Sequence, residues 1–259
     1  MLRKLLKYES KAVVRLLLPL HLALIGVSIL GHFYVKLAME RMSDRFFFMH
    51  LSLAFLYVLA LFAVIVLTYV YLYILRPRQN WFSDEGYLTH TLPVTSAQHI
   101  WSKLLTTMFW VFVNSFCIIL SVLLVSQDLM TEVFGSYGIL STYEPVSFLD
   151  TVEVILNSLL SSALSILLVY MCMSIGYSFN QCKLLISAAI YIGISVVANL
   201  FSTLLVIFVA FGNEDTYYDL VSIMDTRLFT WLSLLATLLL AVGAFLITRH
   251  FLSKRLNLE

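Results

Sequence analysis

The chain has 259 residues, of which 61% are hydrophobic and only 12% are Asp, Glu, Lys or Arg. A soluble domain is about 45–50% apolar and about 25% charged. The composition and the mean hydropathy of +0.94 therefore exclude a soluble enzyme, a disordered chain and a nucleic-acid-binding domain, and they leave a polytopic membrane protein. The formal net charge of +1 hides a strong asymmetry along the chain.

The first 12 residues combine apolar and basic side chains at helical spacing. The leucines fall near one face, and the basic residues fall mostly on the other: Arg3, Lys4, Lys7 and Lys11. This pattern predicts an amphipathic helix over residues 1–12 that lies in the headgroup plane before the chain turns into the membrane. Simple flanking charge is the alternative explanation.

Six apolar stretches are each long enough to cross a bilayer core, which takes about 20 helical residues. They cover residues 13–35, 46–75, 104–126, 152–179, 184–211 and 229–248. Their uniform apolarity differs from the alternating pattern of β-barrel strands. They predict an all-α polytopic membrane protein in which residues 1–259 form a single transmembrane domain.

Basic and acidic residues are distributed unequally between the two sides. With six spans the termini share one side, which holds twelve of the 16 basic residues but only four of the 15 acidic ones. Because Lys and Arg stay on the cytoplasmic side, we expect both termini in the cytoplasm. The acidic connections over residues 127–151 and 212–228 are then external. They form either caps or re-entrant hairpins at the outer surface, or ordinary solvated loops.

The first cytoplasmic loop, residues 76–103, contains start and stop signals for a short rigid helix. Pro77 is expected to prevent the second span from continuing unbroken. An N-cap, two acidic residues of a first turn and a closing proline follow: Ser83, Asp84, Glu85 and Pro93. Thr95 with Gln98 matches a capping box that opens the third span. A rigid exposed element of this kind usually docks a partner.

Two stretches, MLRKLLKYE at the start and DEGYLTHTLPVTSAQHIWSKLL in this loop, resemble permease subunits of bacterial type-2 ABC exporters. Such subunits have six spans with both termini inside, dimerise, and sit on separate ATPase subunits. The resemblance implies a location in the bacterial cytoplasmic membrane. It also implies a coupling helix that docks on the ATPase, formed here by Asp84, Glu85, Gly86, Tyr87, Leu88, Thr89 and Leu92.

The sequence contains neither G-x-x-x-x-G-K-[ST] nor any Gly-Lys pair. A P-loop needs that pattern, so ATP and Mg²⁺ are expected on a partner ATPase, and no cofactor, metal or catalytic residue is expected in this chain. The expected partners are ABC ATPase subunits, membrane lipid and a second permease subunit, which is the same chain or a different one. The expected function is ATP-driven export of an amphipathic substrate, with a peptide toxin or antimicrobial peptide as the best guess.

Two other functions stay open. One is a membrane anchor or sensor subunit that binds an ATPase without transporting anything. The other is an intramembrane enzyme, which the absence of G-x-S-G, H-E-x-x-H and G-x-G-D motifs makes the weaker alternative.

Polar side chains recur at helical spacing inside the spans. They are Asn114 in the third span, Asn157, Ser161 and Ser165 in the fourth, and Tyr191, Ser195 and Asn199 in the fifth. Close helix packing explains such stripes most simply. The alternative is the polar lining of a translocation path between two subunits.

Other side chains in or beside the spans have simpler expected roles. His21 is expected to be a hydrogen-bonded neutral histidine. Aromatic residues that include Trp81 and Trp101 are expected to form an interfacial belt. The three scattered cysteines are expected to be buried free thiols: Cys117, Cys172 and Cys182.

Overall fold

The computed structural model describes residues 2–40, 47–82, 94–137, 148–179, 181–210 and 227–254. Over these ranges the chain contains helices and no strand. Six of the described helices are long and apolar enough to cross a membrane. This confirms the predicted all-α polytopic membrane fold. Helices are the expected solution, because in lipid each backbone N–H and C=O has to be satisfied within its own segment.

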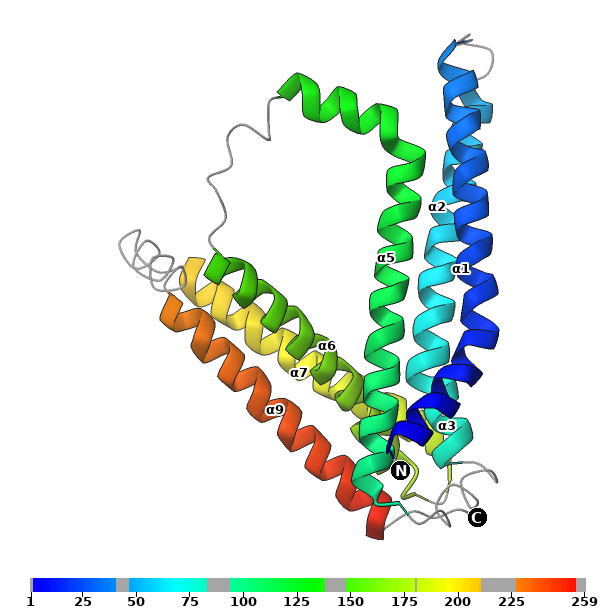
Figure 1. Cartoon of the computed structure of the whole chain (residues 1–259). Coiled ribbons are helices and arrows are strands. Elements are labelled where there is room, and N and C mark those ends of the chain that lie inside the picture. The colour runs from blue at the N-terminus through cyan, green and yellow to red at the C-terminus, as the bar shows by residue number, and fades with distance from the viewer. Residues whose placement is uncertain are drawn as a thin grey trace. The chain divides into compact units, whose positions relative to one another are not determined.

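Figure 1 shows the helices in their order along the chain. Their bounds are α1 (Leu2–Glu40), α2 (Phe47–Val70), η2 (Tyr71–Leu75), α3 (Arg76–Trp81), α5 (Ser96–Tyr137), α6 (Phe148–Gly176), α7 (Lys183–Ala210) and α9 (Arg227–Lys254). The part of the connection over residues 127–151 that the structure describes is helical, because α5 continues to Tyr137. The connection over residues 212–228 lies almost entirely outside the described residues.

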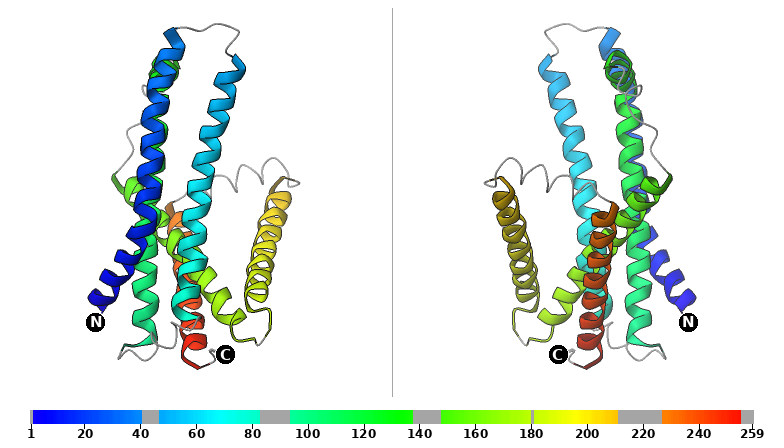
Figure 2. Two further views of the ribbon diagram at one scale, coloured as in Figure 1. Left: turned by 90° about the vertical axis from the view of Figure 1, so that its right-hand side faces the viewer. Right: turned by 90° about the vertical axis from the view of Figure 1, so that its left-hand side faces the viewer.

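The first helix is longer than a bilayer core is thick. The 39 residues of α1 extend over about 58 Å at 1.5 Å per residue, against about 30 Å of hydrocarbon. Residues 2–12 are helical as predicted, but they continue into the first span without a turn. Figure 2 shows that α1 bends in its first third. Pro19 lies inside the helix and leaves the Arg15 carbonyl without its helical donor, which favours a bend there.

Pro77 does not interrupt the second helix, contrary to the prediction, but an irregular turn precedes it. The helix continues from α2 through a π-helical turn, η2, into α3. Within that turn the Arg76 N–H donates to the Tyr71 carbonyl, five residues back. The longer repeat widens the turn ahead of the proline, whose ring and missing N–H disrupt an ordinary α-helical turn. The second helix therefore reaches the first loop without a break.

The chain divides into two compact units. Unit 1 comprises Met1–Arg76 and Leu105–Val146, and unit 2 comprises Pro77–Leu104 and Ser147–Glu259. The single domain over residues 1–259 stays a prediction.

Unit 1 is held together by an apolar cluster and a polar ladder. Val13, Leu17, Leu72 and Trp110 form the buried cluster. The ladder joins α1 to α5 at two levels: His21 contacts Asn114 at 3.0 Å, and Ser28 contacts Ser121 at 2.6 Å. The two levels are seven residues apart on both helices, so α1 and α5 run parallel with a heptad spacing. This packing satisfies polar groups that lipid could not.

Unit 2 is built around α6, which packs against both α7 and α9. The link between α6 and α7 is short, and Cys182 there adopts a positive φ of 51°. Where α7 begins, Gly176 lies close enough to Ser187 that no side chain fits between them. An ion pair also joins Arg227 of α9 to Asp150 of α6 at 3.3 Å.

Candidate functional site

The predicted coupling-helix residues, from Asp84 to Leu92, lie outside the described residues. The structure describes the two segments that flank them, which we call the entry flank and the exit flank. The entry flank is α3 with Phe82, and the exit flank runs from Thr95 to Lys103. From Pro77 onward the entry flank belongs to unit 2, as does the whole exit flank.

The entry flank is anchored by aromatic contacts to the end of α6. Trp81 is 0% exposed, and its ring meets Tyr170 edge to face with 5.2 Å between the ring centroids. The next residue, Phe82, stacks on Tyr177 at 4.3 Å. Edge-to-face and offset contacts of this kind are the preferred aromatic geometries. The chain therefore leaves the second helix at a fixed place on α6.

A polar contact reinforces this anchor. The Tyr177 hydroxyl is hydrogen-bonded to Arg78 of α3. Burial raises the pKa of Tyr177 above its ordinary value, and the adjacent Arg78 charge and hydrogen bond oppose that rise. The tyrosine is thus neutral and hydrogen-bonded at physiological pH.

The exit flank begins with the predicted capping box, which the structure confirms. The Gln98 N–H donates to the Thr95 hydroxyl at 3.4 Å, and the Thr95 N–H donates to the Gln98 side-chain oxygen at 3.3 Å. The following turns are buried, with Ile100 at 0% exposure. Helix α5 therefore starts at a defined residue, immediately after the predicted docking segment.

The two flanks also contact each other. The ammonium nitrogen of Lys103 lies 5.4 Å from the centroid of the Trp81 ring, within the range of a cation–π interaction. Lys103 is buried, so this contact is desolvated and stronger than its surface equivalent. Both segments that flank residues 83–93 thus contact one aromatic cluster, which consists of Trp81, Phe82, Tyr170 and Tyr177.

This arrangement corrects one prediction and supports another. Trp81 does not belong to an interfacial belt, because its side chain is fully buried within unit 2. Trp101 is 46% exposed, as a belt residue should be. Hydropathy alone could not separate the two tryptophans, since burial depends on the tertiary contact with α6.

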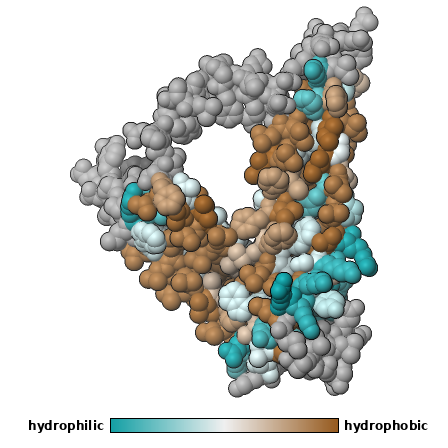
Figure 3. Space-filling view, in the orientation of Figure 1, coloured by the Kyte–Doolittle hydropathy of each residue, from teal (hydrophilic) through white to brown (hydrophobic). Residues whose placement is uncertain are grey.

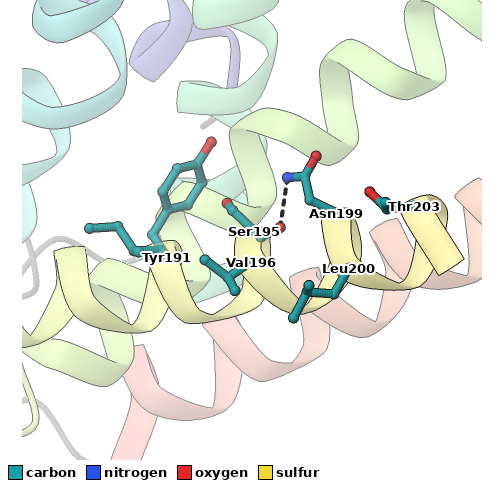
Figure 4. A pocket seen from close by; sticks show the side chains of 7 residues that line it. Tyr191, Ser195, Val196, Asn199, Leu200 and Thr203 are labelled. Carbon is teal, nitrogen blue, oxygen red and sulfur yellow. Dashed lines mark hydrogen bonds between the residues drawn. The ribbon is translucent and has the colours of Figure 1, made fainter.

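The polar stripe of α7 lies on the surface of unit 2. Figure 4 shows that Tyr191, Ser195, Asn199 and Thr203 project from one side of the helix and line a shallow groove. The Asn199 amide nitrogen donates to the Ser195 carbonyl at 2.7 Å. Some of the hydrogen-bonding capacity of these side chains is therefore satisfied by the backbone of α7 itself, while the side chains face outward from unit 2.

The polar stripe of α6 is likewise exposed, and its hydrogen bonds are formed within the helix itself. The Ser161 hydroxyl donates to the Asn157 side-chain oxygen at 3.1 Å, and the Ser165 hydroxyl donates to the Ser162 carbonyl at 2.8 Å. The structure thus leaves the α6 and α7 stripes on exposed helix surfaces of unit 2, where either a packing partner or a path is compatible with them.

Asn114 differs from the other predicted path residues. It belongs to unit 1, is 1% exposed and contacts His21 there. Asn114 therefore packs α5 against α1. This agrees with close helix packing, the simpler explanation of the polar stripes, and not with the lining of a translocation path. Within the described residues no group of three or more His, Cys, Asp or Glu side chains could hold a metal ion.

No family model, curated protein or solved structure matches this chain.

Proposed function

We propose that the chain is the permease subunit of an ATP-driven ABC exporter of the bacterial cytoplasmic membrane. In this proposal, two ATPase subunits bind ATP and Mg²⁺, and residues 83–93 dock on one of them. The substrate is amphipathic, with a peptide as the first class to test. The resemblance of the start and the first loop to type-2 exporter permeases supports the proposal.

One structural observation carries the proposal furthest. The two segments that flank the predicted docking segment contact the same cluster, through Trp81 in the entry flank and Lys103 in the exit flank. Coupling requires that a push on the docking segment move membrane helices instead of being absorbed by a loose tether. Anchors on α6 and at the start of α5 meet that requirement.

A second permease subunit is part of the proposal. A six-span subunit with one docking loop supplies half of a transporter, and the exposed polar stripe of α7 needs cover inside a membrane, where lipid cannot satisfy polar groups. A second copy of this chain would supply that cover, as would a related subunit.

The test is to purify the tagged full-length chain from its native membrane and to identify the proteins that accompany it by mass spectrometry, with an ATPase assay. We expect a P-loop ATPase to be recovered. We expect Glu85→Arg and Tyr87→Ala to lose it, or to retain it with ATP hydrolysis that substrate no longer stimulates.

The matched control is Glu40→Arg, which reverses one acid at the predicted external end of α1. It should recover the ATPase as the unaltered chain does. A preparation without an ATPase, in a detergent that keeps such complexes intact, would contradict the proposal. Equal loss in the control would show that charge reversal alone disrupts the complex, and would contradict the assignment of the docking segment.

A further inference from the structure

We propose that the N-terminal part of α1 is a recognition surface for the headgroups of anionic phospholipids. This surface, the basic face, consists of Arg3, Lys4, Lys7, Lys11 and Arg15, and all five side chains are exposed. The inference goes beyond the proposed function, because it depends on neither an ATPase nor a transported substrate.

The basic face forms one continuous strip along the helix. Four of its members follow one another at intervals of four residues, from Arg3 to Arg15, and Lys4 lies between them in projection. At about 100° per residue the five side chains occupy an arc of about 120°. In Figure 3 hydrophilic residues gather over this part of α1.

The opposite face of the same turns carries the contacts with the rest of unit 1. Val13 and Leu17 are buried in the cluster with Leu72. Glu9, the only acid among the first 15 residues, is turned to this side, where its carboxylate lies 3.3 Å from the Arg76 guanidinium. No acid therefore interrupts the basic face. The opposite face of the same helix is fixed by its contacts with the rest of unit 1.

The C-terminal end of the basic face lies at the right depth. Residues 16–35 contain no Asp, Glu, Lys or Arg. As a helix they extend over about 30 Å, the thickness of the hydrocarbon core. Arg15 then lies at one boundary of the core and Lys36 at the other. Tyr8, which is 72% exposed beside the basic face, is a residue type enriched at the headgroup level.

Charge complementarity identifies the ligand. Ammonium and guanidinium groups donate charge-assisted hydrogen bonds to phosphate oxygens, and guanidinium groups do so in pairs. An anionic leaflet attracts each nearby Lys or Arg, and each contributes up to about fivefold in affinity. Five such groups on one strip favour an anionic headgroup, such as that of phosphatidylglycerol, over a zwitterionic one.

The test is native mass spectrometry of the full-length protein in a neutral detergent, mixed with equal amounts of phosphatidylglycerol and phosphatidylcholine of the same chain length. We expect the protein to carry the anionic lipid severalfold more often. The triple variant Lys4→Gln, Lys7→Gln, Lys11→Gln should lower that ratio severalfold, since only Arg3 and Arg15 of the basic face remain. The triple variant with Arg at the same positions should keep it.

Two single variants provide a matched comparison if the triple glutamine variant does not fold. Lys7→Gln and Lys36→Gln each remove one exposed lysine from α1. Only the first should lower the preference for phosphatidylglycerol. Equal binding of the two lipids by the unaltered chain, a preference that the triple glutamine variant leaves undiminished, or equal effects of the two single variants would overturn the inference.

Discussion

The hydrogen atom that Gly176 carries in place of a side chain sets how closely α7 approaches the end of α6. A Cβ built at this position would meet the Ser187 hydroxyl, and it would lie only 2.7 Å from the Ser187 backbone nitrogen and 2.8 Å from its Cα. Backbone atoms cannot rotate away as a side chain can. The approach of the two helices therefore depends on this glycine.

We expect Gly176→Ala to destabilise the protein by about 1–3 kcal/mol, the usual cost of overpacking a well-packed site. Gly193→Ala on α7 is the control, because a Cβ there meets no atom within 4 Å. Alanine should be neutral or slightly favourable at that position. Unfolding of the two purified variants in detergent measures the difference. Similar losses in both would contradict the close approach at Gly176.

The pair of His21 and Asn114 shows how far single residues can be interpreted from sequence. The sequence placed a polar residue inside each of two apolar helices, and it predicted that His21 is hydrogen-bonded. The structure adds the partners: Nδ1 donates to the Leu17 carbonyl at 2.6 Å, and Nε2 contacts the Asn114 side chain at 3.0 Å. Partner choice could not be predicted, because it depends on which helices pack together.

At the scale of the element, hydropathy predicted each long helix because 20 consecutive apolar residues leave few other folds in lipid. The ends were less predictable. Proline usually ends or kinks a helix, yet the helix continues past Pro77. In the π turn at Tyr71–Leu75 the backbone hydrogen bonds shift locally to a spacing of five residues, which accommodates the proline. Cys182, expected to be a buried thiol, is exposed in the turn between α6 and α7. The coupling-helix residues stay a prediction.

Trp81 allows the anchor of the entry flank to be tested by itself. We expect Trp81→Ala to cost about 3–5 kcal/mol, because it removes a fully buried indole and its contacts with Tyr170 and Lys103. Trp101→Ala is the matched control. That indole is 46% exposed and contacts Phe245, so its loss should cost about 1 kcal/mol.

A second variant separates packing from hydrogen bonding at this anchor. Among the described residues the Trp81 indole N–H has no hydrogen-bond partner. Trp81→Phe should therefore retain most of the stability that Trp81→Ala loses. Equal unfolding midpoints for the alanine variants at positions 81 and 101 would show that the entry flank is not anchored as described.

At the scale of the whole molecule, the charges at the helix ends follow the alternation of the spans. Arg3 to Arg15 precede the apolar part of α1, Arg249 follows that of α9, and Lys183 begins α7. By alternation these positions share one side of the membrane. Asp150 and Glu153, at the start of α6, fall on the other side. The asymmetry therefore predicts a single orientation, with the turn before α7 in the cytoplasm.

Cys182 provides a native reporter of that orientation. It is exposed in the turn before α7, whereas Cys117 and Cys172 are buried within spans. We expect a membrane-impermeant maleimide to label the unaltered chain in inside-out vesicles and not in right-side-out vesicles, and Cys182→Ser to abolish the labelling. Introducing Lys36→Cys into the Cys182→Ser variant should reverse the pattern. Position 36 lies near the C-terminal end of α1, which the predicted topology places on the outer side of the membrane. Labelling of Cys182 from the outer side would invert the orientation, and it would remove the docking segment from the compartment that contains ATP.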